Sequence, residues 1–240
     1  MYDNQYQGHD RYGYTPLDNG RSLTNTVSST MKRVYFKMTL GLAASAITAL
    51  LCANNGFLNY MAYHSWLMWV LIIAELGLVI GITSGINKLS STVASALFYL
   101  FAVVNGLTLS SIFVVYSLSA ITKTFFITAG TFGAMSVYGY FTNQDLSKIG
   151  SYLIMALIGL IIASVVNIFL KSSGFDWIIS IVGVLIFIGL TAWDTQQIKA
   201  MAQAAPSDSV GRLATLGALS LYLDFINLFL YLLRIFGNRD

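Results

Sequence analysis

Long apolar runs alternate with short polar connections along most of this chain. A membrane-spanning helix needs about 20 mostly apolar residues, and seven stretches meet that requirement. They are Val34–Ala53, Trp66–Ile86, Ser95–Tyr116, Thr124–Phe141, Tyr152–Leu170, Trp177–Ile198 and Leu213–Phe236. The pattern predicts an all-α integral membrane protein with seven transmembrane helices, of which the Gly/Thr/Ser-rich fourth has the weakest signal.

The first 30 residues contain no such run. They are polar and rich in Tyr, Asn and Gly, so they lack the apolar surface needed to fold alone. They also contain no apolar core of a signal peptide, and we therefore expect the first apolar segment to remain as a membrane anchor. The predicted organisation is a disordered cytoplasmic tail over residues 1–30 and one membrane domain over residues 31–240.

Composition agrees with a multi-pass membrane protein. The chain is 56% hydrophobic and 10% charged, whereas a soluble domain is about 25% charged. The net charge of +3 is small and the basic residues are scattered, so no nucleic-acid partner is predicted. Of the 13 basic residues, nine fall on the side of the N-terminus and four on the other side. The positive-inside rule then places the N-terminus in the cytoplasm.

An aspartate stands inside the last apolar segment. A charge in the middle of a bilayer is costly unless it is paired, protonated or turned toward a cavity. Ser220, Asp224, Asn227 and Tyr231 are spaced so that they fall on one face of a helix. We therefore predict a polar seam that faces the interior of the bundle.

A second aspartate, Asp194, lies near the cytoplasmic end of the sixth segment. Consecutive helices joined by a moderate connection are often antiparallel neighbours, so Asp194 and Asp224 can approach at similar depth. Two adjacent carboxyls in a low-dielectric site cannot both ionise easily, and the pair is expected to share a proton and act as a pH sensor. The alternative is that Asp194 is an interfacial residue paired with Lys199 or Arg212.

When deprotonated, the two aspartates are also ligands that a hard cation prefers. Asp194 and Asp224 are therefore candidate calcium ligands, with Asn227 and Glu75 as further oxygen donors. Beyond such an ion, no cofactor is expected. The sequence holds no His/Cys/Asp metal cluster, nucleophile elbow, Walker loop or dinucleotide fingerprint, and we expect no enzyme activity.

Two other segments carry polar residues at membrane depth. Glu75 in the second segment is either a carboxyl bonded to a neighbouring helix or a site on an ion path. On the same segment Gly77, Gly81 and Gly85 form a stripe of small residues, which lets another backbone approach closely. Asn105 in the third segment is expected to hydrogen-bond across helices.

Four motifs, in this order, resemble those of the Bax inhibitor-1 family, also called transmembrane Bax inhibitor motif proteins, and in particular its bacterial members. The motifs are Asn105–Phe113, Tyr138–Ser147, Ala192–Lys199 and Leu219–Phe229, and the resemblance covers about residues 30–237. It implies seven helices around a central last helix, in a bacterial inner membrane. It also implies a calcium leak regulated by pH, with calcium and protons as the ions that pass or bind.

The resemblance assigns the pH sensor to Asp194 and Asp224 and places Glu75 with them on the ion path. Close bacterial relatives have an arginine that latches the aspartate pair, at a region that here contains no arginine. The candidate latches in this chain are Lys88, Arg33 and Arg212.

Two other functions stay open from the sequence. The first is a non-conducting membrane protein that binds and modulates a partner, such as a membrane protease or a stress or cell-death factor. The second is a proton-coupled transporter, for which an inverted repeat is expected, and the sequence has no visible repeat of that kind.

Overall fold

The computed structural model describes residues 16–206 and 209–237, with side chains from residue 25 onward. The described chain forms seven long helices and two short ones, α2 and α5. The helices are α1 (Pro16–Asn54), α2 (Phe57–Tyr63), α3 (Trp66–Gly85), α4 (Ser91–Leu109), α5 (Ile112–Val115), α6 (Leu118–Phe141), α7 (Ser147–Leu170), α8 (Ser173–Ala204) and α9 (Val210–Phe236).

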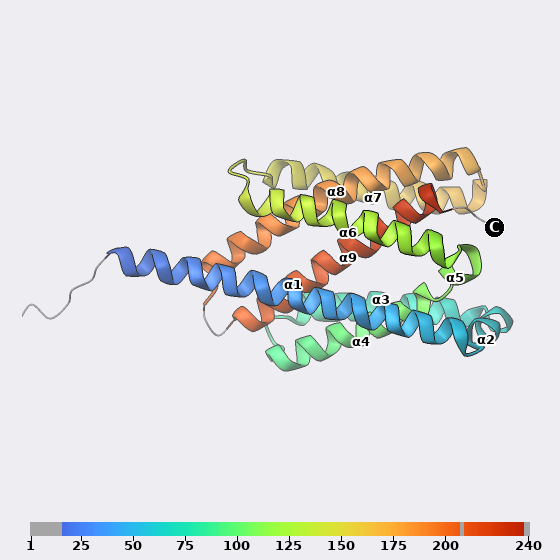
Figure 1. Cartoon of the computed structure of the whole chain (residues 1–240), viewed down its shortest axis with the longest axis horizontal. Coiled ribbons are helices and arrows are strands. Elements are labelled where there is room, and N and C mark those ends of the chain that lie inside the picture. Colours follow the sequence, from blue (N-terminus) through green and yellow to red (C-terminus); the bar gives the residue numbers. More distant parts are fainter. Residues whose placement is uncertain (1–15, 207–208, 238–240) are drawn as a thin grey trace, which may run out of the picture.

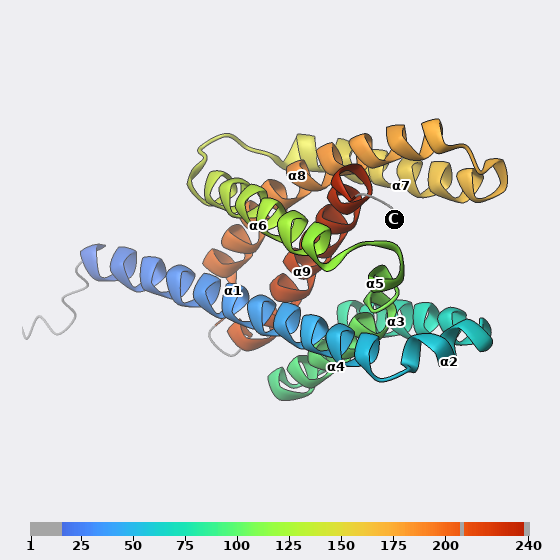
Figure 2. The same cartoon turned by 45° about the vertical axis from the view of Figure 1, so that its right-hand side comes forward.

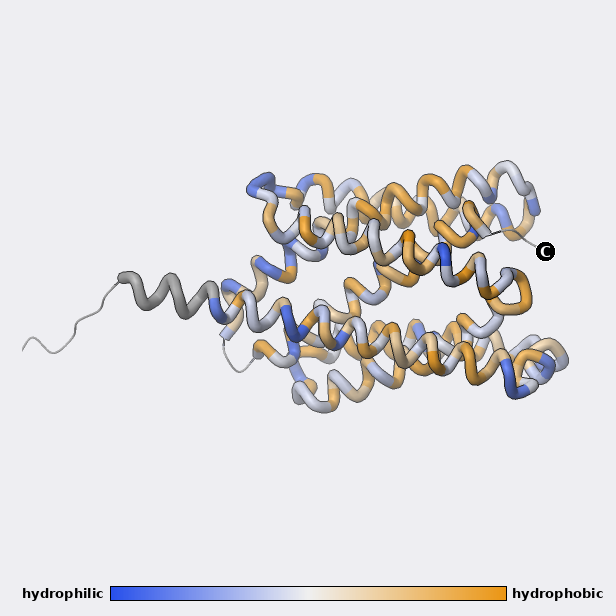
Figure 3. The backbone as a smooth tube through the Cα atoms, viewed as in Figure 1, coloured by the Kyte–Doolittle hydropathy of each residue, from blue (hydrophilic) through white to orange (hydrophobic). Residues whose placement is uncertain are grey.

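The long helices run up and down along one direction, and the chain enters and leaves the bundle at opposite ends (Figure 1). In two views α9 runs obliquely between a group formed by α1, α3 and α4 and a group formed by α6, α7 and α8 (Figures 1 and 2). It packs against α8, α1, α6 and α4. Apolar residues dominate the middle of the bundle, and the more polar residues gather toward its two ends (Figure 3).

Six helical stretches of the described chain are long and apolar enough to cross a membrane: those of α1, α3, α4 with α5, α7, α8 and α9. The seventh long helix, α6, has the Gly/Thr/Ser-rich composition that weakened its signal in the sequence. Its 24 residues extend about 36 Å at 1.5 Å per residue, and it packs beside α8 and α9. The predicted seven-helix membrane fold is confirmed.

The last helix is the centre of the bundle, as predicted. In its most apolar stretch 67% of the residues are buried, against 6% for α7 at the periphery. Ala214 and Ala218 on α9 are fully buried, and such small residues let neighbouring helices approach closely.

The structure corrects the predicted tail. Helix α1 begins at Pro16, well before residue 30, and the side chains of Val27, Thr30 and Met31 are buried. These apolar and small residues recur at helical spacing, so the bundle begins inside the segment assigned to the tail. Residues 1–15 lie outside the described part of the chain.

Two further boundaries differ from the sequence pattern. The third segment does not continue as one helix to residue 116, because α4 ends at Leu109 and α5 follows as a separate turn. At this break the hydroxyls of Ser110 and Ser111 donate to the carbonyls of Leu107 and Thr108. The predicted connection over residues 54–65 contains the short helix α2.

The close helix crossings use other glycines than the predicted stripe. A Cβ at Gly77 or Gly81 would meet nothing within 4 Å, so no backbone packs on that stripe within the described chain. By contrast, a Cβ at Gly106 of α4 would lie 2.6 Å from the carbonyl oxygen of Ser45 on α1. A Cβ at Gly139 of α6 would collide with the carbonyl of Ala192 on α8.

Candidate functional site

The two aspartates meet between α8 and α9, the pair of helices with the most extensive packing in the described chain. Their carboxyls lie in side-chain hydrogen-bonding contact, and the hydroxyl of Ser220, one turn before Asp224, donates to Asp194. A carboxylate only accepts hydrogen bonds, so a bond between two carboxyls requires a proton on one of them. The structure thus brings the side chains of Asp194 and Asp224 together between these two helices.

Asp224 is the more enclosed member of the pair. Its side chain is 4% exposed, and its Oδ2 has no hydrogen-bond partner among the described residues. A buried charged oxygen without a donor is strongly unfavourable. The site therefore suits a carboxyl that holds a proton or meets a cation.

No basic side chain among the described residues forms an ion pair with either aspartate. Lys88 and Arg33 are exposed and Arg212 is half-buried. Within residues 25–206 and 209–237 none of them forms an ion pair with either aspartate, and the recorded ion pair is Arg234–Asp176, at 3.7 Å near the other end of the bundle. The expected latch is absent from this arrangement of the described chain, and so is the alternative of an interfacial pair between Asp194 and Arg212.

Two half-buried lysines bind neutral oxygens instead. Lys199 donates to the carbonyl of Tyr140 at 2.7 Å and lies over that ring, 4.9 Å from its centroid, so it does not pair with Asp194. Lys37 donates to the hydroxyls of Ser95 at 2.7 Å and Thr215 at 2.6 Å. Sequence reasoning counted Lys37 only as a charge at the cytoplasmic side and offered Lys199 as an alternative partner of Asp194, because the observed partners of both lysines are distant in sequence.

A second polar cluster surrounds Glu75 on α3. Its two carboxylate oxygens accept from Asn105 Nδ2 at 3.2 Å and from Thr108 Oγ1 at 2.5 Å, both on α4. The Tyr222 hydroxyl of α9 donates to Asn105 Oδ1 at 2.8 Å and lies 2.6 Å from Ser45 Oγ on α1. Asn105 thus bonds across helices as expected, and the cluster joins four helices.

Sequence reasoning missed Tyr222, whose ring is fully buried. The only signal was a tyrosine in the middle of an apolar helix, where its hydroxyl must find a partner. It lies about 200° around α9 from Asp224, so the two residues face different neighbours.

The predicted seam ends at Asp224. The Asn227 amide donates to the Leu223 carbonyl of its own helix at 2.8 Å, and the Tyr231 ring stacks on Phe187 with centroids 5.9 Å apart. Neither residue reaches the aspartate pair.

The expected four-residue set of calcium ligands is therefore not assembled. Glu75 is held by α4, and Asn227 is bonded to its own backbone. The described residues contain no group of three or more His, Cys, Asp or Glu side chains that could hold a metal ion. Asp194 and Asp224 alone remain as candidate ligands.

This fold and site define a multi-pass helical membrane protein with a buried carboxyl pair between its two most closely packed helices. Residues 27–240 match the family described as "Inhibitor of apoptosis-promoting Bax1", and the chain belongs to this Bax inhibitor-1 family. It is 49% identical over 213 residues to the inner membrane protein YbhL of Escherichia coli K12, covering 87% of this chain and 91% of the relative. It is also 49% identical over 212 residues to an uncharacterised protein of Borreliella burgdorferi, covering 87% and 91% of the two chains. An uncharacterised membrane protein of Streptococcus pyogenes is 36% identical over 211 residues, which cover 87% of this chain and 92% of that protein.

Proposed function

We propose that this protein is a pH-sensitive calcium leak channel, gated by Asp194 and Asp224 sharing one proton. The observation that supports the proposal is the contact of two carboxyls between α8 and α9 without a basic partner in the described chain. Two such groups titrate as a coupled pair. The proton count of the pair is then a property that pH can change.

The gating step follows from electrostatics. With one proton, the pair forms a hydrogen bond that holds α8 to α9. Without it, two negative charges face each other in a low-dielectric site and repel, which favours separation of the helices. The freed carboxylate oxygens, including Asp224 Oδ2, are the kind of ligand that Ca²⁺ prefers. We therefore expect the leak to rise as pH rises.

Glu75 has a different role in this proposal. Both of its carboxylate oxygens already accept hydrogen bonds from α4, which favours an interhelical role over a place on the ion path. Glu75 helps to fix α1, α3 and α4, the group of helices against which α9 moves.

We further propose an inner-membrane location with a cytoplasmic N-terminus. The E. coli relative is named an inner membrane protein, and nine of the 13 basic residues lie on the N-terminal side. In this orientation the leak lets calcium enter the cytoplasm down its gradient.

The test is calcium flux into proteoliposomes that contain a calcium dye, measured over a series of pH values. The wild type should leak in a pH-dependent manner, whereas Asp224→Asn and Asp194→Asn should lose the pH dependence. Asp145→Asn is the matched control, because Asp145 is an exposed carboxyl in the α6–α7 connection. An unchanged pH profile in both pair variants would sink the proposal. No flux from the wild type at any pH would favour a non-conducting protein that modulates a partner.

A further inference from the structure

A continuous groove runs between α1 and α6. These two helices hardly touch each other, although both pack on α9. Two cavities fill the gap, one of about 310 Å³ and one of about 740 Å³. Leu42, Phe125 and Phe225 line both cavities, so the two form one groove whose floor is α9.

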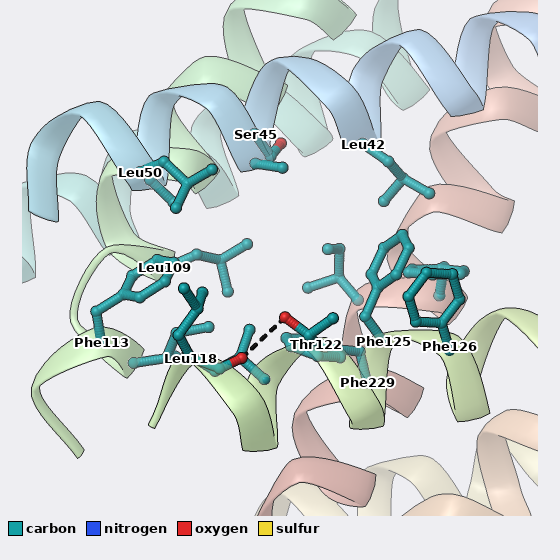
Figure 4. A pocket seen from close by; sticks show the side chains of 16 residues that line it. Leu42, Ser45, Leu50, Leu109, Phe113, Leu118, Thr122, Phe125, Phe126 and Phe229 are labelled. Atoms are coloured by element: carbon teal, nitrogen blue, oxygen red, sulfur yellow. Dashed lines mark hydrogen bonds between the residues drawn. The ribbon is translucent and has the colours of Figure 1, made fainter. Parts of the chain in front are cut away.

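The smaller cavity is the apolar part of the groove. Side chains from α1 and from the α6 segment face each other across it, among them Leu42 and Phe125 (Figure 4). Its two polar side chains are already bonded: Ser45 donates to the carbonyl of Ala102 at 2.6 Å, and Thr122 to the carbonyl of Leu118 at 2.8 Å. This part of the groove therefore offers a ligand only hydrocarbon contact.

The larger cavity ends at a cationic mouth. Lys32 and Tyr140 line it there, and Lys199 lies over the Tyr140 ring. Neither cavity is lined by an Asp or Glu. Leu42 lies ten residues after Lys32 on α1, which is about 15 Å along a helix. That span equals about half of the 30 Å hydrocarbon core of a bilayer, or one leaflet.

One buried hydroxyl inside the larger cavity lacks a partner. Ser136 is 5% exposed and lines this cavity, yet its Oγ has no hydrogen-bond partner among the described residues. A buried Ser or Thr in a helix commonly bonds the carbonyl four residues before it, as Thr128 does with Thr124 at 2.8 Å. Ser136 lies five residues from the end of α6 at Phe141, about 7.5 Å below the mouth. Its hydroxyl is thus placed to donate to an acceptor just beneath a head group.

We propose that this groove binds one anionic glycerophospholipid from the leaflet on the side of the N-terminus. The lipid phosphate binds the ammonium group of Lys32, and the nearby charge of Lys199 adds to the positive potential at the mouth. An ester carbonyl accepts from Ser136, and one acyl chain lies on Phe225 and continues toward Leu42. Lipid binding at this groove does not depend on the calcium leak, so each can fail without the other.

The test uses the full-length protein in detergent, incubated with phosphatidylglycerol or with phosphatidylcholine of the same acyl chains. Native mass spectrometry then counts the lipid retained. The wild type should retain one phosphatidylglycerol in preference to phosphatidylcholine. Lys32→Gln should reduce that preference by about fivefold, the effect of one basic residue near a charged lipid surface.

Two glycines of α6 provide a matched pair of variants. A Cβ at Gly133 or at Gly130 meets nothing within 4 Å, so neither position is closed to a side chain at its first atom. Gly133 lines the groove and Gly130 does not. Gly133→Leu should fill the groove and abolish lipid retention, whereas Gly130→Leu should retain the lipid as the wild type does.

Three results would overturn the proposal: equal retention by the two leucine variants, equal retention of the two lipids by the wild type, or a peptide in place of the lipid. Thermal unfolding verifies that each variant is folded. If Gly133→Leu does not fold, Ser136→Ala and Lys32→Gln decide the matter, because neither enlarges a side chain. If Ser136→Ala and Lys32→Gln both retained phosphatidylglycerol at the wild-type level, lipid binding in this groove would be contradicted.

Discussion

Two carboxyl sites inside the bundle, the half-buried Glu75 and the Asp194–Asp224 pair, lie on different sides of α9, and their hydrogen bonding differs. At Glu75 neutral donors from α4 occupy both carboxylate oxygens, and Tyr222 of α9 extends the network to α1. At Asp194 and Asp224 a carboxyl faces a carboxyl, and one oxygen of Asp224 has no partner in the described chain. At the first site both carboxylate oxygens have a donor, whereas the second site leaves one carboxyl oxygen unpaired within the described chain.

This difference indicates a structural role for the Glu75 site and favours a role in sensing pH for the aspartate pair. A fully satisfied buried network rigidifies the elements it joins, while a partly satisfied one has a high energetic cost that its environment can relieve. Since Tyr222 and Asp224 point about 200° apart on the same helix, α9 is anchored on one side and free to respond on the other. We expect movement between α8 and α9, with α1, α3 and α4 as the fixed frame.

The largest predicted effect is on stability, from replacing each carboxyl by leucine. Glu75→Leu leaves the donors of Asn105 and Thr108 unsatisfied, at about 1–3 kcal/mol for each buried group. Asp224→Leu removes a carboxyl whose Oδ2 has no partner in the described chain and that shares one hydrogen bond with Asp194, so it should cost less, about 0.5–1.5 kcal/mol. Reversible unfolding in detergent micelles measures both, and Glu75→Gln is the control that keeps an acceptor. A similar loss in both leucine variants would mean that the two sites do not differ as described.

A smaller effect is predicted for Tyr222→Phe. Removing the hydroxyl leaves Asn105 Oδ1 without its donor and should lower the free energy of unfolding by about 1–3 kcal/mol. A double-mutant cycle with Asn105→Leu should give a coupling energy of about 0.5–3 kcal/mol, as for residues in one network.

The same cycle between Tyr222→Phe and Asp194→Asn is the control for independence. The two sites share no hydrogen-bond partner, so these effects should add within about 0.5 kcal/mol. A coupling well above that value would mean that the Glu75 cluster and the aspartate pair form one network.

The sequence could predict the aspartate pair because its two helices are consecutive. Depth along two antiparallel neighbours can be counted from the ends of the connecting loop, and the count brought Asp194 and Asp224 together. The Glu75 cluster joins α1, α3, α4 and α9, and no such count aligns four helices that are distant in sequence. Its central member, Tyr222, counts as apolar in a hydropathy pattern.

Competing hydrogen-bond partners explain why the sequence predictions were wrong at single residues. Asn227 has the spacing of the seam, but an Asn in a helix can bond the carbonyl four residues before it, and here it does. The alternative pairing of Asp194 with Lys199 failed for a related reason. Lys199 is one turn beyond Asp194 in sequence, yet a carbonyl and a ring on α6 bind its ammonium group. Tertiary neighbours decide between such partners, and the sequence does not specify them.

The smallest effect is predicted for Asp145, an exposed carboxyl in the connection between α6 and α7. Hydrogen bonds from the hydroxyl and the backbone N–H of Ser147 lower the pKa of Asp145. Because the pKa is lower in the folded state, the carboxylate adds stability at neutral pH, and this contribution is lost as pH falls through the folded value. Because water screens an exposed group, Asp145→Asn should lower the melting temperature only slightly at neutral pH. In acid the variant should lose correspondingly less stability than the wild type, because it has no carboxylate at this position to protonate.

Thermal unfolding over an acidic to neutral pH series measures this effect, with Asp224→Asn in parallel. The Asp145 variant should leave the pH profile of the calcium leak unchanged, because its carboxyl is exposed in a connecting loop, outside the buried pair. If Asp145→Asn moved that profile as far as Asp224→Asn does, the pH response would originate in the surface loop. The contrast between the satisfied Glu75 carboxylate and the unsatisfied aspartate pair would then no longer explain the proposed gating.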